Sequence, residues 1–423
     1  LVDSERMLAA LLAAGIQLVE EPTEADVVLI NTCGFIRAAQ EESLQALEEA
    51  LELKADGTIK GVVCAGCLSQ RFSNELTEHL PGLDAVLGID SAPDIVRAVL
   101  AATGDQSLIE IPTLETLVEH CLPRELTTPP WFAYLKIGDG CDNWCSYCAI
   151  PIIRGRARSA SLDELAVEAK ALTSRGVKEL NLIAQDLGRY GQDLPDAPSL
   201  AALVSRLLEE TGPDLHWLRL LYLHPEHIQD DLLTLMAEQP RLVRYLDVPF
   251  QHASGPVLAR MNRKGDLQSQ LALVQRLRDA VPGLALRTTL LVGFPGETES
   301  DFEALMEFIE KGRFDRLTAF AYSPEEGTAA YDLPDRVPEE LAQHRLELVF
   351  ESQRLVSAEL TSAFVGQKLE VLLESNPSPG QYVGRGYRDA PEVDCEVQVK
   401  GSEIAVGQFA SVHITGADDY DMR

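Results

Sequence analysis

Residues 140–148 read Gly-Cys-Asp-Asn-Trp-Cys-Ser-Tyr-Cys, with the three cysteines at the spacing C-x3-C-x2-C. The stretch follows an apolar run over residues 131–137 that is typical of a β-strand. Three thiolates on one short loop can hold three corners of an iron–sulfur cluster and leave one iron open to a small molecule. A tetrahedral zinc site would need a fourth protein ligand nearby, and no Cys or His follows before His216. The spacing therefore predicts an open cluster rather than three unrelated cysteines, with the ligands Cys141, Cys145 and Cys148.

The length and composition are those of a globular protein with more than one domain. With 423 residues, of which 46% are hydrophobic, the chain is long enough for two or three cores. No apolar run approaches the roughly 20 residues that cross a bilayer, and no secretory signal is visible. Eight cysteines, several at ligand spacings, indicate metal binding in a reducing cytosol. We therefore expect a cytoplasmic protein with no membrane partner.

The chain is strongly acidic, with a formal net charge of −31. Non-specific nucleic-acid binding depends on Lys and Arg that neutralise phosphates, so this charge argues against nucleic acid as the main direct partner. It favours encounter with a basic protein instead. Residues 154–158 (Arg-Gly-Arg-Ala-Arg) form a local basic run. Such a run is usually solvated, and contact with a substrate is the alternative.

Residues 1–108 predict an open α/β sheet domain. Helical patterns alternate there with short apolar runs typical of buried parallel strands. The expected helices are residues 4–14 and 37–54, and the expected strands are residues 26–31, 59–65 and 84–88. In such sheets ligands gather at the carboxyl ends of the strands.

Two of these strand ends carry cysteine. Cys33 follows the first strand, and Cys64 and Cys67 form a C-x2-C pair around the end of the second. Alone, this pair fits a redox centre, half of a zinc site or simply buried cysteines. If the two strands are parallel neighbours, Cys33 and Cys67 meet at one edge while Cys64 lies inside the sheet. We favour Cys33 and Cys67 as ligands and Cys64 as core, and we expect a third ligand elsewhere.

A stretch rich in proline and threonine, residues 105–128, predicts a linker. Cys121 lies in it without a partner at a ligand spacing, and we interpret it as a bystander. A longer series of strands and helices follows. It predicts a parallel βα barrel or part of one, with strands at residues 133–137, 179–184, 217–223, 245–250, 284–292 and 315–322.

Polar or glycine-rich groups follow most of these strands. They are Gln185-Asp186, His224-Pro225, Gln251-His252, residues 293–297 (Gly-Phe-Pro-Gly-Glu) and residues 322–324 (Tyr-Ser-Pro). In βα barrels the active site lies at the carboxyl ends of the strands. Because the cysteine loop follows the first strand, we expect these groups to face that loop.

A long helical segment, residues 338–364, leads into a C-terminal region of short strands. The strand patterns are residues 368–373, 381–385, 396–399 and 409–414, separated by Gly and Pro turns. They predict a small antiparallel β-barrel. Residues 356–423 hold five basic and eleven acidic residues, so this barrel lacks the charge for nucleic-acid binding.

The cysteine loop resembles the signature of radical S-adenosylmethionine (SAM) enzymes. With residues 31–33 (Asn-Thr-Cys), Gly66-Cys67 and the C-terminal barrel, the chain resembles the radical SAM methylthiotransferase family over essentially its whole length. The resemblance implies an α/β protein of three parts: a methylthiotransferase N-terminal domain (1–108), a radical SAM core with a partial βα barrel (127–355) and a TRAM domain (356–423).

Within this family the chain resembles the branch that modifies a ribosomal protein. The matching stretches are residues 222–225 (Tyr-Leu-His-Pro), 322–328 (Tyr-Ser-Pro-Glu-Glu-Gly-Thr), 389–394 and 419–422. The resemblance implies methylthiolation of the β-carbon of an aspartate in ribosomal protein uS12, free or in the small subunit. It also implies an electron donor such as flavodoxin.

Two 4Fe–4S clusters and SAM are the cofactors that the resemblance implies. Cys141, Cys145 and Cys148 would hold the cluster that cleaves SAM, and the resulting radical would take the weakly acidic hydrogen from the aspartate. No catalytic residue is assigned on the protein, because the cofactor carries this chemistry. Cys33, Cys67 and one more cysteine would hold the second cluster, which delivers the sulfur.

The resemblance also suggests residues that contact SAM: Tyr147, Gln185, Asp186, Gly293, Gly296 and Glu297. Tyr147 is expected near the adenine. The two glycines would let the backbone approach the cofactor, and Gln185 and Asp186 suit the ribose or the amino group.

One departure from the family concerns the second cluster. In the family a further cysteine lies just before the residues that match 1–5, and this chain begins at Leu1. We therefore expect the first strand and the third ligand to be absent from this chain, and the second cluster to bind poorly unless Cys64 substitutes.

Two alternatives remain open from the sequence. One is a methylthiotransferase for a modified adenosine in transfer RNA, which a basic C-terminal barrel would favour. The other is a non-catalytic protein that holds zinc or a cluster for assembly. Cleavage of SAM to 5′-deoxyadenosine would exclude the second.

Overall fold

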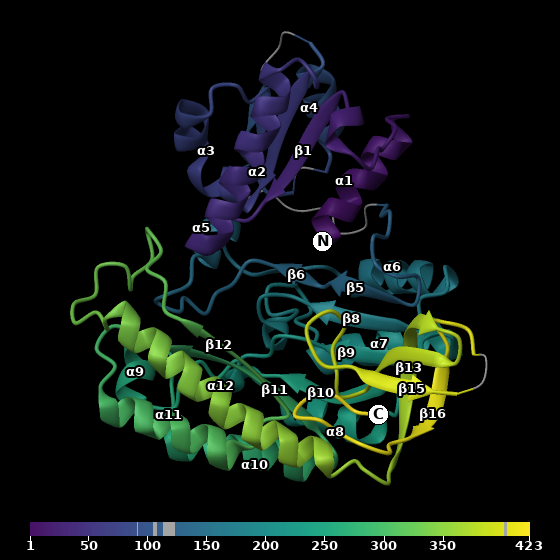
Figure 1. Ribbon diagram of the computed structural model, residues 1–423, viewed down its shortest axis with the longest axis vertical. Coiled ribbons are helices and arrows are strands. Elements are labelled where there is room, and N and C mark those ends of the chain that lie inside the picture. The colour runs from purple at the N-terminus through teal and green to yellow at the C-terminus, as the bar shows by residue number, and fades with distance from the viewer. Residues whose placement is uncertain (91, 105–107, 113–122, 402–403) are drawn as a thin grey trace. The chain divides into compact units, whose positions relative to one another are not determined.

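The computed structural model describes residues 1–90, 92–104, 108–112, 123–401 and 404–423 (Figure 1). These residues fold into two compact units. The first unit comprises Leu1–Pro129, Asp139–Ala160 and Ser323–Tyr331, and the second comprises Pro130–Gly138, Ser161–Tyr322 and Asp332–Arg423. Cys121 lies outside the described residues.

The first unit contains a parallel sheet with the strand order β1-β2-β3-β4. The strands are β1 (Val27–Thr32), β2 (Gly61–Gly66), β3 (Ala85–Leu87) and β4 (Leu108–Glu110). The helices are α1 (Val2–Ala13), α2 (Arg37–Ala55), α3 (Cys67–His79) and α4 (Ile95–Ala102), with a short 3-10 turn at Pro22–Glu24. The open α/β sheet expected for this region is confirmed.

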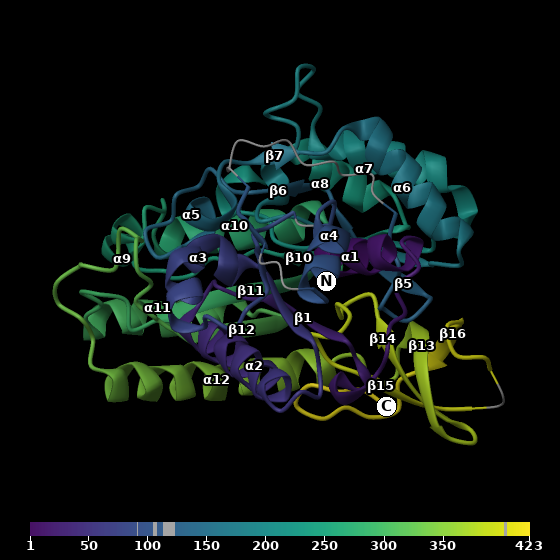
Figure 2. The same ribbon diagram turned by 90° about the horizontal axis from the view of Figure 1, so that it is seen from above.

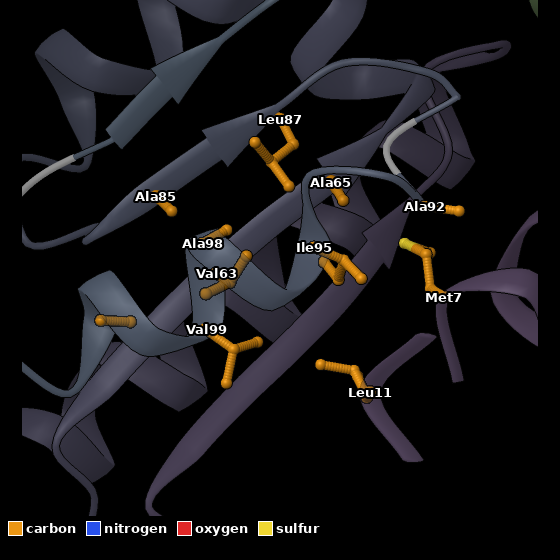
Figure 3. Packing of buried hydrophobic residues seen from close by; sticks show 11 residues of the cluster. Met7, Leu11, Val63, Ala65, Ala85, Leu87, Ala92, Ile95, Ala98 and Val99 are labelled. Atoms are coloured by element: carbon orange, nitrogen blue, oxygen red, sulfur yellow. The ribbon is translucent and has the colours of Figure 1, made fainter. Parts of the chain in front are cut away.

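Helices cover both faces of this sheet because its strands are apolar on both sides. On one face α1 and α4 pack against β2 and β3, through a cluster that includes Met7, Leu11, Val63, Leu87 and Ile95 (Figure 3). On the other face α2 and α3 pack against β2, through residues that include Leu47, Val62, Cys64 and Leu68. The result is a three-layer arrangement.

The linker predicted for residues 105–128 is wrong for the residues of it that the structure describes, 108–112 and 123–128. Leu108–Glu110 form strand β4, in which Ile109 pairs with Val86 of β3. Arg124 donates from Nε to the buried carboxylate of Glu5 over 3.0 Å. A run of three residues has no detectable periodicity, so this strand depends on its neighbour in the sheet.

The second unit contains a parallel sheet with the order β12-β11-β10-β9-β8-β5. Its strands are β5 (Phe132–Lys136), β8 (Glu179–Ile183), β9 (Trp217–Leu220), β10 (Leu242–Asp247), β11 (Ala285–Val292) and β12 (Arg316–Ala321). Each lies within a few residues of its predicted range. Neighbouring strands follow one another in the chain, as in a partial βα barrel.

Helices connect these strands, a further helix follows the last strand β12, and most of them pack against the next helix along the chain (Figure 2). They are α6 (Leu162–Ser174), α7 (Leu200–Thr211), α8 (Asp230–Glu238), α9 (Gly255–Arg260), α10 (Leu267–Ala280), α11 (Glu299–Gly312) and α12 (Glu339–Ser362). Short 3-10 turns at Leu187–Arg189, Gly212–Asp214 and Pro225–His227 lie in the connections.

The C-terminal region is a curled antiparallel half-barrel with the order β15-β14-β13-β16. Its strands are β13 (Lys368–Ser378), β14 (Gln381–Gly386), β15 (Val397–Lys400) and β16 (Phe409–His413). It packs on the larger sheet through Leu372 and Phe409, which meet Trp217 and Tyr245. Buried Arg385 joins the two by donating to Glu179 at the start of β8, over 2.6 Å. This region belongs to the second unit.

In the part of the chain that the structure describes, no helix combines the length and the apolar character needed to cross a membrane.

Candidate functional site

The cysteine loop is held closed by its own backbone. β6 (Gly138–Asp139) and β7 (Arg158–Ser159) form a two-stranded sheet at its base. Inside it, the Cys141 N–H donates to the Gly155 carbonyl over 3.1 Å, and the Cys148 N–H donates to the Cys145 carbonyl over 3.0 Å. Gly140 has a φ of 77° and lies against the backbone of Arg156, where a Cβ would collide. The glycine thus allows the two ends of the loop to approach.

The three thiols of this loop are half-buried. Among the described residues no group of three or more His, Cys, Asp or Glu side chains is arranged to hold a single metal ion. In an iron–sulfur cluster each thiolate binds its own iron, so the sulfurs need not converge on one ion. Three thiols on one closed loop are the ligand set that such a cluster uses.

Cys33 and Cys67 lie side by side at the carboxyl edge of the first sheet. The parallel register pairs Thr32 of β1 with Gly66 of β2, and each cysteine is the next residue of its chain segment. Burial is the larger cause of the raised pKa of Cys67, and the Cys33 thiol is close enough to contribute to it. The expected convergence of these cysteines thus follows from the register of the two strands.

Two glycines permit this approach. Gly66 has a φ of 106°, and a Cβ there would meet the carbonyl of Thr32. A Cβ on Gly34 would lie 2.7 Å from the carbonyl oxygen of Cys67. Any larger residue at either position would push the two strand ends apart.

Cys64 lies inside β2, with none of its surface exposed. Desolvation by burial raises the pKa of its thiol to about 11. Its sulfur faces the α2–α3 side of the sheet, among apolar neighbours. The structure therefore places it in the core, as the sequence analysis expects.

Cys67 is the first residue of α3 and also borders the cysteine loop. It packs against the cluster of Ile89, Ala149 and Ile153, in which Ala149 directly follows Cys148 and Ile153 belongs to the next helical turns. Burial raises the pKa of the Cys67 thiol, and the charge of Arg154 opposes that rise. The two cysteine groups that the sequence separates are thus neighbours within the first unit.

The basic run at residues 154–158 is not uniformly solvated. Arg154 ends the short helix α5 (Ile150–Arg154), and its side chain is only 15% exposed. It donates to Asp139 Oδ2 over 2.7 Å and to the sulfur of Cys67 over 3.4 Å. Arg156 is 82% exposed and pairs with Asp142. The solvated interpretation is wrong for Arg154 and correct for Arg156.

Residues 323–331, which follow β12, join the first unit through buried Glu325. Its carboxylate accepts hydrogen bonds from the Arg37 N–H, Gln40 Nε2 and Arg71 Nη1. The Ala330 N–H donates to the carbonyl of Ser146 in the cysteine loop over 2.8 Å. The segment therefore connects α2 and α3 to that loop. In the sequence this stretch carries only a family resemblance, and no local pattern in it indicates this structural role.

The predicted SAM residues of the second unit differ in the hydrogen bonds that their side chains already make. Asp186, at the end of β8, accepts hydrogen bonds from the backbone N–H groups of Gly188 and His224 and contacts His227 Nδ1 at 2.6 Å. Its carboxylate therefore organises the strand-end loops. Among the described residues the side-chain oxygen of neighbouring Gln185 is buried without a hydrogen-bond partner. That oxygen is an available acceptor.

Glu297 is fully buried and holds the loop after β11. Its carboxylate accepts hydrogen bonds from the Gly293 N–H over 2.8 Å and from Arg345 Nη1 over 2.7 Å. Side chains already fill the space beside the two glycines, since a Cβ on Gly293 would meet Ala342 and one on Gly296 would meet Arg260. Close packing thus explains why glycine stands at both positions, independently of any cofactor.

Tyr147 lies in the cysteine loop, within the first unit, and is half-buried. The remaining predicted SAM residues belong to the second unit.

Three family models match the chain. The Radical SAM superfamily matches residues 135–309, a family described as Uncharacterized protein family UPF0004 matches residues 1–88, and the TRAM domain matches residues 365–423. The fold and the cysteine loop thus define a radical SAM enzyme, and enzymes of this class use a 4Fe–4S cluster and SAM.

Relatives specify the family further. A protein of Pelotomaculum thermopropionicum named "Ribosomal protein uS12 methylthiotransferase RimO" is 44% identical, over 100% of this chain and 95% of the relative. Proteins with the same name from Trichlorobacter lovleyi and Myxococcus xanthus are 42% and 43% identical, over 100% of this chain and 94% and 88% of the relatives. The chain belongs to the RimO family of radical SAM methylthiotransferases.

Among solved structures, the radical S-adenosylmethionine methyltransferase TsrM from Kitasatospora setae is similar, with a TM-score of 0.57 and 13% identity. The similarity covers 77% of this chain and 70% of TsrM. At this identity it supports the fold alone.

Proposed function

We propose that this enzyme transfers a methylthio group to the β-carbon of an aspartate in ribosomal protein uS12. The full-length relatives supply the activity and the substrate. The observation that carries the proposal is the contact of Cys67 with Ala149 and Ile153. This contact supports the proposal because a reaction that breaks a C–H bond and forms a C–S bond at one carbon requires the proposed sulfur-insertion site and the proposed radical-generating site to be neighbours.

Cys141, Cys145 and Cys148 are the proposed ligands of the SAM cluster. When bound, this cluster supplies the electron that cleaves SAM. The chain's own contribution is to keep the loop closed, through the Cys141–Gly155 and Cys148–Cys145 backbone hydrogen bonds. A closed loop limits the positions that the three sulfurs can take.

Cys33 and Cys67 are the proposed ligands of a second 4Fe–4S cluster. This assignment is supported by the β1–β2 register and by the two glycines that let the strand ends carrying these cysteines approach closely. Buried Cys64 is a poor candidate for the third ligand, because it lies inside β2 in the apolar core that α2 and α3 cover.

The proposed SAM contacts fall into two groups. Tyr147 and Gln185 are proposed to touch the cofactor, and Gln185 has the acceptor to do so. Asp186 and Glu297 are proposed to hold the loops that receive it, since their carboxylates already accept backbone hydrogen bonds. Gly293 and Gly296 keep those loops close-packed, and backbone contact with SAM remains a proposal for them.

The proposed partners follow from charge. Ribosomal proteins bind RNA and are basic, which suits a chain with a net charge of −31. An electron donor such as flavodoxin is proposed as the source of reducing equivalents. Modification of transfer RNA is disfavoured by the acidic TRAM region and by the names of the full-length relatives.

The test is anaerobic reaction of the reconstituted enzyme with uS12, SAM and a reductant, followed by mass spectrometry of uS12. We expect one methylthio group on one aspartate. Cys145→Ala should abolish formation of 5′-deoxyadenosine, whereas Cys67→Ala should keep it and lose the methylthio product. A methylthiolated adenosine in transfer RNA, with unmodified uS12, would overturn the proposed substrate.

A further inference from the structure

One side chain connects the two cysteine groups of the first unit. Arg154 donates from Nη1 to Asp139 Oδ2 over 2.7 Å and from Nη2 to Cys67 Sγ over 3.4 Å. Asp139 lies two residues before Cys141 and its side chain is fully buried. The guanidinium thus bridges the base of the SAM-cluster loop and a proposed ligand of the second cluster.

We propose that Arg154 is a positioning residue that fixes the sulfur of Cys67 for the second cluster and ties that sulfur to the SAM-cluster loop. The inference rests on the proposed function, because it takes Cys67 to be a cluster ligand.

The geometry of arginine suits this bridge. Its rigid, planar fork presents several N–H donors, so it can bind a carboxylate with one arm and a sulfur with the other. The ammonium group of lysine is a single point charge on a flexible stem. Because Asp139 anchors one arm, the other is directed at Cys67 at little entropic cost.

The charge of Arg154 also acts on a bound cluster. Hydrogen bonds to cluster sulfurs and nearby positive charge favour the more negative, reduced state and raise its reduction potential. Asp3 opposes this effect, since its Oδ2 lies 3.4 Å from the same Nη2. As a thiolate ligand of the proposed cluster, Cys33 would add further negative charge beside Cys67. Arg154 is the cation that we identify in direct contact with this sulfur.

The second cluster can be observed alone in the full chain when Cys141, Cys145 and Cys148 are all replaced by Ala. In this background we compare Arg154→Gln and Arg154→Lys with the control Arg156→Gln, whose side chain is exposed. The measurements after anaerobic reconstitution are iron and sulfide per chain, the rate of iron loss to a chelator, and the midpoint potential followed by electron paramagnetic resonance.

We expect Arg154→Gln to lose iron to the chelator about tenfold faster or more, as for other residues that orient a metal ligand, and to have a lower midpoint potential. Arg154→Lys should have a midpoint potential between those of Arg154→Gln and the parent, but it should lose iron as fast as Arg154→Gln. Arg156→Gln should match the parent in both measurements. Equal retention and potential in the parent and Arg154→Gln would overturn the inference, as would equal losses in Arg154→Gln and Arg156→Gln.

Cys67→Ala in the same background separates this inference from the proposal on which it rests. If Cys67→Ala keeps the iron of the parent, Cys67 is not a ligand and both ideas fall. If Cys67→Ala loses the iron but Arg154→Gln behaves as the parent, only the role of Arg154 falls.

Discussion

Arg71 Nη1 lies 3.1 Å from Glu325 Oε2, and the two side chains are only 3% and 5% exposed. Arg71 belongs to α3, the helix that begins with Cys67, and Glu325 belongs to the segment that follows β12. The pair therefore fixes the helix that carries a proposed cluster ligand to residues 323–331. Removing one partner of such a pair leaves an uncompensated buried charge.

Glu325→Gln should lower the free energy of unfolding of the first unit by about 3 kcal/mol, because it leaves Arg71 buried without its counter-charge. Urea unfolding measures this change, and limited proteolysis should cut residues 323–331 faster. Glu326→Gln is the matched control, since that neighbouring side chain is exposed. Indistinguishable unfolding curves for the two variants would contradict the role of Glu325.

Gly66→Ala should separate the ends of β1 and β2. A Cβ at this position collides with the Thr32 carbonyl, and the φ of 106° is strained for any residue except glycine, so we expect a cost of roughly 2–4 kcal/mol. The amount of iron bound at Cys33 and Cys67 should fall together with this stability. The control is Gly57→Ala, which has a φ of 74° but open space around it. A loss of iron in the control as well would mean that strain in general, rather than this contact, is responsible.

Cys64→Ala should leave the iron content unchanged and cost roughly 1 kcal/mol of stability, because it removes one buried atom from a packed core. The raised pKa of Cys64, about 11, also predicts that a thiol reagent modifies it only after unfolding. Peptide mapping after brief alkylation of the protein measures this. A drop in iron equal to that of Cys67→Ala would show instead that Cys64 is a ligand.

His224 should make the second unit sensitive to acid. Desolvation and the neighbouring charge of Arg263 lower the pKa of His224 to about 3, and its Nδ1 accepts a hydrogen bond from the Glu226 N–H over 3.3 Å. A neutral buried imidazole contributes stability above the unfolded pKa of about 6.5, and this stability is lost progressively as the pH falls towards 3.

Between about pH 7.5 and about pH 5 the loss due to His224 should be about 2 kcal/mol. His224→Asn keeps an acceptor for the Glu226 N–H but does not titrate, so its unfolding free energy should fall less over the same range. Urea unfolding at the two pH values tests this. Parallel pH dependence in the parent and the variant would assign the acid sensitivity to other groups.

Local pattern was enough to predict much of the fold and part of the site. Apolar runs separated by helical patterns predict β1 and β2 as strands of an open α/β sheet, because a buried parallel sheet needs strands that are apolar on both faces. Once that register holds, Cys33 and Cys67 must meet and Cys64 must face the core. Strand β4 was missed because three residues carry no periodic signal.

Charged residues were the least predictable part of the site. Arg154 and Arg156 lie two positions apart in one basic run, yet one contacts Cys67 and the other faces solvent. Asp186 and Glu297, expected to touch SAM, have carboxylates occupied by backbone hydrogen bonds. No residue spacing distinguishes these cases, since burial depends on what the fold packs against each side chain.

The sequence by itself determined the family, the α/β fold class and the cysteines proposed as ligands, because these depend on motifs, cysteine spacing and periodicity along the chain. Only the tertiary structure decided which charges act on which cysteine. Arg71 and Glu325 are 254 residues apart, and Arg154 reaches Cys67 across 87 residues. Contacts at such separations leave no local pattern, because they form only when packing brings the segments together.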